Sequence, residues 1–207
     1  MLLVGAGDRS GGGLDVLLSA HRVAPGGIAY GLDASPDMLT LAHANAAQAS
    51  VTNARFLHGH IEDIPLPGGH VDVVISNCVI NLSADKPRVL AGAFRVLRPG
   101  GRLGISDVTA DDGTDPGQLA EAEQQAGCGA TLTQAHYRDL LQAAGFTGIA
   151  FTSNARDRPW PAFRDHLGSQ AGRSADMIHK SADQENSAHR PPGAGKVMKR
   201  LVTLTIS

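Results

Sequence analysis

The sequence is poor in aromatic residues and carries little excess charge. Aromatic side chains make up 4% of the 207 residues, and the formal net charge is −2 at pH 7. A nucleic-acid-binding domain usually has a basic face with interleaved aromatic side chains, so we do not expect a nucleic-acid partner. No apolar run is long enough to span a membrane, and the amino-terminal segment is too short and lacks the basic residues of a signal peptide. We therefore expect a cytoplasmic chain with no membrane partner.

Cysteine is also scarce, with only Cys78 and Cys128 in the chain. In a cytoplasmic protein, thiols are more often reduced than bridged. Thiolates are soft ligands for thiophilic centres, so the pair indicates a soft-ligand site more than a disulfide scaffold. Taken alone, a cysteine such as Cys78 is more often a small buried apolar side chain than a ligand.

Short apolar runs alternate with longer amphipathic segments along most of the chain. The runs that predict strands are residues 28–32, 54–57, 71–76, 102–108 and 149–153. The segments that predict helices are residues 14–24, 35–49, 86–97 and 133–144. This alternation predicts a doubly wound α/β fold with a mostly parallel sheet covered by helices on both faces.

The expected domain organisation has three parts. Residues 1–153 form the α/β domain, and residues 154–196 are polar with only isolated apolar side chains. Such a composition cannot bury much apolar surface, so we expect a poorly ordered insertion there. Leucine, valine, threonine and isoleucine return in residues 197–207, which we expect to form the closing strand of the same domain.

A glycine run, Gly11, Gly12 and Gly13, precedes the first predicted helix, and Asp33 ends the next predicted strand. Glycines allow a ligand to approach the backbone, a helix start favours anionic groups, and an acid at this distance can bind ribose hydroxyls. The spacing predicts a nucleoside-containing cofactor, although doubly wound domains without one also carry glycine-rich turns. Ser10 occupies the place of the third glycine in the dinucleotide fingerprint, which disfavours a nicotinamide cofactor.

Five segments carry motifs that narrow the function. They are residues 10–15, 31–38, 59–65, 71–86 and 95–103. The most specific is Ser76-Asn77-Cys78-Val79-Ile80-Asn81-Leu82, followed downstream by Gly127-Cys128-Gly129. Together they resemble the arsenite methyltransferases, which have the Rossmann-like class I fold of S-adenosylmethionine-dependent methyltransferases, over about residues 10–150.

The resemblance implies methylation of trivalent arsenic, in arsenic detoxification, with S-adenosylmethionine as cofactor. Cys78 and Cys128 would be the catalytic residues and would hold the arsenic as thiolates. The implied cofactor-binding residues are Gly11, Gly12, Gly13, Asp33, Ile61, Glu62, Ser76 and Asn77. Asp33 would bind the ribose, Ile61 and Glu62 the adenine, and Ser76 and Asn77 the methionine end. Glutathione or another small thiol would be the co-substrate and reductant that completes the arsenic coordination.

Alternatives remain for the site and for the function. Ile61 is also explained as a core residue and Glu62 as a solvated turn residue. Ungapped alignment with the family places Arg9 at the first glycine of the cofactor loop, so either residues 2–4 form the first strand ahead of inserted residues, or the loop is altered. An altered loop favours a truncated, catalytically impaired chain that only binds a metalloid through its two cysteines. A methyltransferase of a small organic metabolite is the third possibility.

Overall fold

A computed structural model of the chain describes residues 1–4, 11–110, 112–113, 131–153 and 198–205. The chain divides into two units, Met1–Ser153 with Lys196–Ser207 and Asn154–Gly195, and all described residues belong to the first. The expected insertion at residues 154–196 lies outside the described residues, so the predicted domain organisation stays a prediction.

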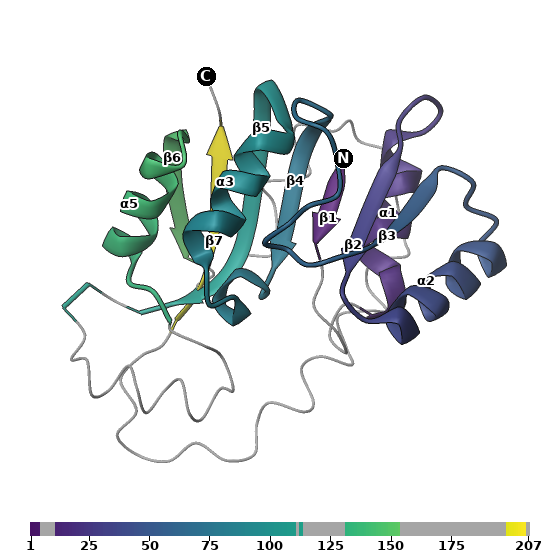
Figure 1. The fold of residues 1–207 in the computed structure, drawn as a ribbon, viewed down its shortest axis with the longest axis horizontal. Coiled ribbons are helices and arrows are strands. Elements are labelled where there is room, and N and C mark those ends of the chain that lie inside the picture. Colours follow the sequence, from purple (N-terminus) through teal and green to yellow (C-terminus); the bar gives the residue numbers. More distant parts are fainter. Residues whose placement is uncertain (5–10, 111, 114–130, 154–197, 206–207) are drawn as a thin grey trace, which may run out of the picture. The chain divides into compact units, whose positions relative to one another are not determined.

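Seven strands of the first unit form one sheet. They are β1 (Leu2–Val4), β2 (Ala29–Asp33), β3 (Ala54–His58), β4 (Val71–Asn77), β5 (Leu97–Thr109), β6 (Thr147–Ser153) and β7 (Met198–Thr205). Their order is β3-β2-β1-β4-β5-β7-β6 (Figure 1). The first five strands pair in parallel, and β7 is antiparallel to both β5 and β6. The predicted doubly wound, mostly parallel sheet is confirmed.

Among the described residues, helices lie in the connections from β1 to β2, β2 to β3, β4 to β5 and β5 to β6. The α-helices are α1 (Leu14–Val23), α2 (Pro36–Gln48), α3 (Lys86–Val96) and α5 (Gln134–Ala143), and the short 3-10 helices are η2 (Gly11–Gly13) and η3 (Ile80–Leu82). Three of the α-helices begin at a side chain that accepts a hydrogen bond from an otherwise unpaired amide. These side chains are Ser35 for α2, Asp85 for α3 and Thr133 for α5. Within the described part of the chain, no helix has the length and apolarity that a membrane span requires.

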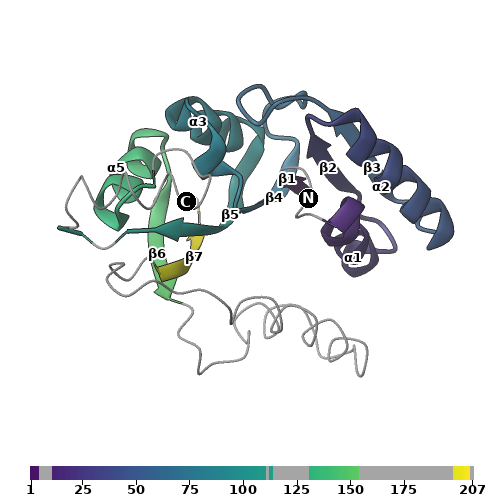
Figure 2. The ribbon, with the colours of Figure 1, turned by 90° about the horizontal axis from the view of Figure 1, so that it is seen from below.

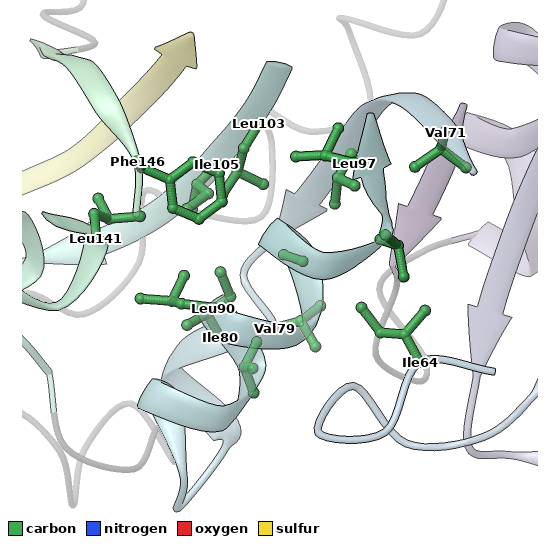
Figure 3. Close-up of a cluster of buried hydrophobic side chains, with 14 of the residues drawn as sticks. Ile64, Val71, Val79, Ile80, Leu90, Leu97, Leu103, Ile105, Leu141 and Phe146 are labelled. Atoms are coloured by element: carbon green, nitrogen blue, oxygen red, sulfur yellow. The ribbon is translucent and has the colours of Figure 1, made fainter. Parts of the chain in front are cut away.

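Both faces of the sheet are covered, as Figure 2 shows with α3 and α5 on one side and α1 on the other. The strand residues alternate between two apolar clusters because successive side chains point to opposite faces. In β2, Ala29 packs with Val16 and Ala20 of α1, whereas Leu32 joins the larger cluster on the α3 and α5 face. Figure 3 shows the larger cluster, which includes residues of β4, β5, η3, α3 and α5.

The starts of two strands, β1 and β5, test the sequence predictions. Leu2–Val4 forms β1 and pairs with both β2 and β4, so the first strand at residues 2–4 is confirmed. The inserted residues of that alternative fall within residues 5–10, outside the described part of the chain, and stay a prediction. Leu97, predicted as the end of a helix, instead begins β5, and the prediction of a start at Arg102 was wrong. Leu97 is buried and pairs with Val71, and the register then shifts before Arg102 pairs with Val73.

Candidate functional site

Several of the predicted site residues lie at the carboxyl edge of the sheet. Val4, the last residue of β1, pairs with Leu32 of β2 on one side and with Ser76 of β4 on the other. The residues that follow, Asp33 and Asn77, therefore lie at the same edge on either side of β1. The chain order reverses between β1 and β4, and this switch point is where open α/β sheets bind their ligands.

The glycine run at this edge turns against α2. Gly12 and Gly13 have positive φ angles of 59° and 85°, and the Gly12 carbonyl accepts a hydrogen bond of 3.0 Å from Asn45 Nδ2. A Cβ on Gly12 would lie 2.8 Å from the Leu41 side chain, and one on Gly13 would lie 2.9 Å from Ala42 Cβ. The fold itself therefore requires glycine at both positions, in addition to any requirement of a ligand.

A pair of substitutions separates the cost of the left-handed backbone from the cost of the contact with α2. We expect Gly13→Ala to lower the free energy of unfolding by about 2 to 4 kcal/mol, from the left-handed backbone and the contact with α2 together. Gly100→Ala is the matched control, because Gly100 has φ 77° and an added Cβ there would meet nothing within 4 Å. Its expected cost is about 1 to 2 kcal/mol. Equal losses in urea unfolding would contradict the packing argument.

The Asp33 carboxylate is half-buried, and one of its two oxygens accepts a hydrogen bond from the chain. Its Oδ1 accepts a hydrogen bond of 2.9 Å from the Ser35 amide, and its carbonyl accepts one of 3.1 Å from the Gly59 amide. Among the described residues, none donates to Asp33 Oδ2. The turn is thus fixed by one carboxylate oxygen while the other is available to a hydroxyl group.

The turn after β3 is hydrogen-bonded to the segment that follows Cys78. Ile61 is half-buried and packs against the larger core cluster. Glu62 accepts a short hydrogen bond from the Ser83 hydroxyl through Oε1, and its carbonyl accepts one of 3.1 Å from Arg88 Nε. Glu62 is therefore not a freely solvated turn residue.

Cys78 lies directly after β4, where the sequence predicts it. It is half-buried, has a positive φ of 55°, and donates a backbone hydrogen bond of 2.7 Å to the Ser106 carbonyl. Ser76 is buried, its hydroxyl has no hydrogen-bond partner among the described residues, and Asn77 is exposed. Cys128 lies outside the described residues, so its pairing with Cys78 stays a prediction.

A buried polar cluster beside Cys78 was missed by the sequence analysis. Its members are Asn81, Ser83, Lys86, Asp107 and Tyr137, all of them buried. The Asp107 carboxylate accepts 2.8 Å and 3.2 Å hydrogen bonds from the side chain and the amide of Asn81, and Lys86 donates to the Ser83 carbonyl. One signal could have revealed Asp107. It continues the alternation of Leu103 and Ile105 in β5, which places a carboxylate at a core position.

Burial raises the pKa of the Asp107 carboxyl to about 6, although hydrogen bonds from Val108 and Asn81 and the charge of Lys86 act in the opposite direction. Burial, and then the charge of Asp107, also raise the pKa of the Tyr137 hydroxyl. Removing a carboxylate from water disfavours its charged form, so Asp107 costs folding free energy once it ionises.

This shift predicts a pH dependence of stability. The pKa of Asp107 is ordinarily 3.8 and is about 6 in the folded chain. Between these two pH values, Asp107 keeps a proton in the folded chain that it releases in the unfolded chain. The unfolded state binds fewer protons there, so the free energy of unfolding falls as the pH rises through this window, by about 3 kcal/mol from this group. Urea unfolding of the wild type and Asp107→Asn at about pH 4 and pH 7 tests it. The variant should show a flatter pH dependence, and an identical slope in both chains would contradict the assignment.

Comparison with known proteins adds family information to this geometry. A family model described as a methyltransferase domain matches residues 10–154. An arsenite methyltransferase of Halobacterium salinarum is 36% identical over 161 residues, which are 75% of this chain and 41% of the relative. One of Aquipseudomonas alcaligenes is 44% identical over 109 residues, which are 49% of this chain and 32% of the relative. The chain thus spans less than half of the length of either relative.

A solved structure shows the same arrangement of elements. It is an arsenic(III) S-adenosylmethionine methyltransferase from Chlamydomonas reinhardtii, with a TM-score of 0.65 and 26% identity. The match covers 99% of this chain and 62% of that chain. The likeness extends over nearly the whole of this chain, so the two proteins share a fold.

Proposed function

The chain belongs to the methyltransferase domain family and has the class I fold, and from this we propose that it methylates trivalent arsenic with S-adenosylmethionine as methyl donor. The observation that carries the proposal is that Asp33 ends β2 and Cys78 follows β4 at the same edge of the sheet, on either side of β1. A ribose-binding acid and a soft sulfur ligand are the two groups that a methyl donor and a thiophilic substrate need at a shared site.

The described residues fit a nucleoside cofactor. Asp33 Oδ2 has no hydrogen-bond partner in the described part of the chain and would accept from the ribose hydroxyls. Ile61 and Glu62 would flank the adenine, Gly11, Gly12 and Gly13 would form the turn beside the cofactor, and Ser76 and Asn77 would line its methionine end. The buried Ser76 hydroxyl, which has no partner among the residues that the structure describes, supports a polar ligand at the end of β4. Bound there, S-adenosylmethionine would supply an electrophilic methyl group to the arsenic lone pair.

Arsenic would be held as a substrate by protein sulfur. Cys78 projects from the turn that ends β4, and Cys128 is the second proposed thiolate. Glutathione or another small thiol would provide the remaining sulfur and act as reductant. The arsenic lone pair is itself the nucleophile, so no general base on the protein is needed. The contribution of the chain is alignment of the two reactants, which for well-oriented pairs is worth about 7 to 11 kcal/mol.

Isothermal calorimetry with S-adenosylmethionine tests the cofactor half of the proposal. We expect a saturable isotherm in the micromolar range, about −8 kcal/mol, and additional heat when arsenite and glutathione follow. The absence of cofactor binding in both titrations would contradict the proposal and favour a chain that only sequesters the metalloid. Cofactor binding without any response to arsenite would favour a methyltransferase of an organic metabolite.

A further inference from the structure

Cys78 has a backbone conformation that an isolated chain would rarely adopt. Its φ of 55° lies in the left-handed region, although the residue is not glycine. This conformation costs about 1 to 2 kcal/mol for a residue with a side chain, and it persists only where the surroundings enforce it. The conformation also directs the Cys78 side chain at the end of β4, so whatever enforces it determines where the sulfur lies.

Residues of β5 hold the turn at Cys78 itself and three residues beyond it. The Cys78 amide donates to the Ser106 carbonyl at 2.7 Å. Three residues further along, Asn81 Nδ2 donates to Asp107 Oδ1 at 2.8 Å and to the Val108 carbonyl at 2.7 Å, and the Asn81 amide donates to Asp107 Oδ2 at 3.2 Å. The carboxylate thus binds the backbone and the side chain of one residue at once.

The remainder of the turn is anchored by apolar contacts that do not select its conformation. Val79 and Ile80 are buried in the larger core cluster near Leu90 of α3 (Figure 3). Apolar packing is not directional, whereas a carboxylate that accepts two bonds from one residue permits only a narrow range of positions. Asp107 and Asn81 are 2% and 1% exposed, and no apolar pair could supply these directed bonds.

From these contacts we infer that Asp107 and Asn81 are positioning residues, which hold the turn that presents the Cys78 sulfur to the cofactor. The inference rests on the proposed function. The pair does not touch the reactants and acts through the Cys78 turn. Misplacement of a reacting group by about 1 Å can lower a rate about a hundredfold, so loosening the turn should slow methyl transfer far more than it weakens cofactor binding.

Asp107→Asn is the most direct variant. In either orientation its amide places an NH₂ group against one of the two Asn81 donors, which removes a hydrogen bond without changing the size of the side chain. At saturating S-adenosylmethionine and arsenite we expect the methyl-transfer rate to fall about a hundredfold, while the Kd of S-adenosylmethionine changes less than about threefold. Asn81→Ser leaves Asp107 intact and should likewise slow methyl transfer with little change in the Kd of S-adenosylmethionine. This variant replaces Asp107→Asn in the test if Asp107→Asn does not fold.

Thr109→Val is the matched control. Thr109 lies two residues beyond Asp107 on the same face of β5 and is equally buried, and no residue in the described ranges forms a hydrogen bond with its hydroxyl. Its substitution should leave the methyl-transfer rate unchanged. Amide hydrogen exchange at Cys78, followed by NMR, supplies a readout that does not depend on the reaction. Exchange should accelerate in Asp107→Asn but not in Thr109→Val.

The outcomes separate this inference from the proposed function. An active wild type whose rate or Cys78 exchange is unaffected by Asp107→Asn would overturn the positioning role alone. A wild type that binds S-adenosylmethionine but does not methylate arsenic would overturn the proposed function, and the positioning role in methylation with it. A slowed rate, unchanged cofactor affinity and faster Cys78 exchange would together support the role.

Discussion

Replacement of Cys78 by serine is expected to lower the rate of arsenic methylation by about a hundredfold or more, while S-adenosylmethionine still binds. Serine is close in size to cysteine, but its hydroxyl is a hard ligand with little affinity for a soft centre. Cys78 is half-buried at the end of β4, so the change removes the sulfur without disturbing the larger core cluster. Methylated arsenicals, separated by chromatography and counted by mass spectrometry, give the rate.

Cys78→Gly is the control that separates sulfur chemistry from backbone conformation. Glycine adopts positive φ without a steric cost, so this variant relieves the left-handed backbone while it removes the thiol. We expect it to be as inactive as Cys78→Ser, and Cys128→Ser to be inactive as well. Methylation at the wild-type rate in any of the three would refute the assigned role of that cysteine and would favour an organic methyl acceptor.

Asp33→Asn is expected to weaken the binding of S-adenosylmethionine by about 10- to 100-fold. The variant keeps an oxygen that accepts from the Ser35 amide at 2.9 Å, so the turn after β2 should stay folded. It loses the negative charge and the second acceptor, and a hydrogen bond to a charged group contributes about 1.5 to 3 kcal/mol. Calorimetry on the purified variant measures the change.

Asp37→Asn is the matched control for this substitution. Asp37 is exposed in the first turn of α2, only four residues from Asp33. Its replacement by asparagine removes the same charge from the same part of the chain. The affinity of this variant for S-adenosylmethionine should stay within about twofold of the wild type, because an exposed charge surrounded by water interacts only weakly with other charges. Equal weakening in both variants would show that Asp33 acts only through net charge.

Local sequence signals were sufficient for most of the fold. Ser35 and Pro36 predict the start of α2, and the Ser35 hydroxyl does accept from the Met38 amide. The apolar run before Cys78 predicts β4, which ends at Asn77. These features are encoded by neighbouring residues, through caps, turns and alternation, so reading the chain in order reveals them.

The missed features depend on contacts between distant parts of the chain. Asn81 and Asp107 are 26 residues apart, and neither belongs to a local motif that predicts the hydrogen bonds between them. The start of β5 at Leu97 likewise depends on its pairing with Val71. Glu62 was left open between a cofactor contact and a solvated turn because its partner, Ser83, lies in another segment.

The most direct test of the central claim is methyl transfer in a single turnover. The chain would be mixed with isotopically labelled S-adenosylmethionine, arsenite and glutathione, and the arsenic species and S-adenosylhomocysteine would be counted together. We expect labelled methylarsenic in the wild type, one S-adenosylhomocysteine for each methyl group, and formation of both products slowed about a hundredfold or more in Cys78→Ser. A wild type that binds S-adenosylmethionine and arsenite but yields no labelled methylarsenic would contradict it.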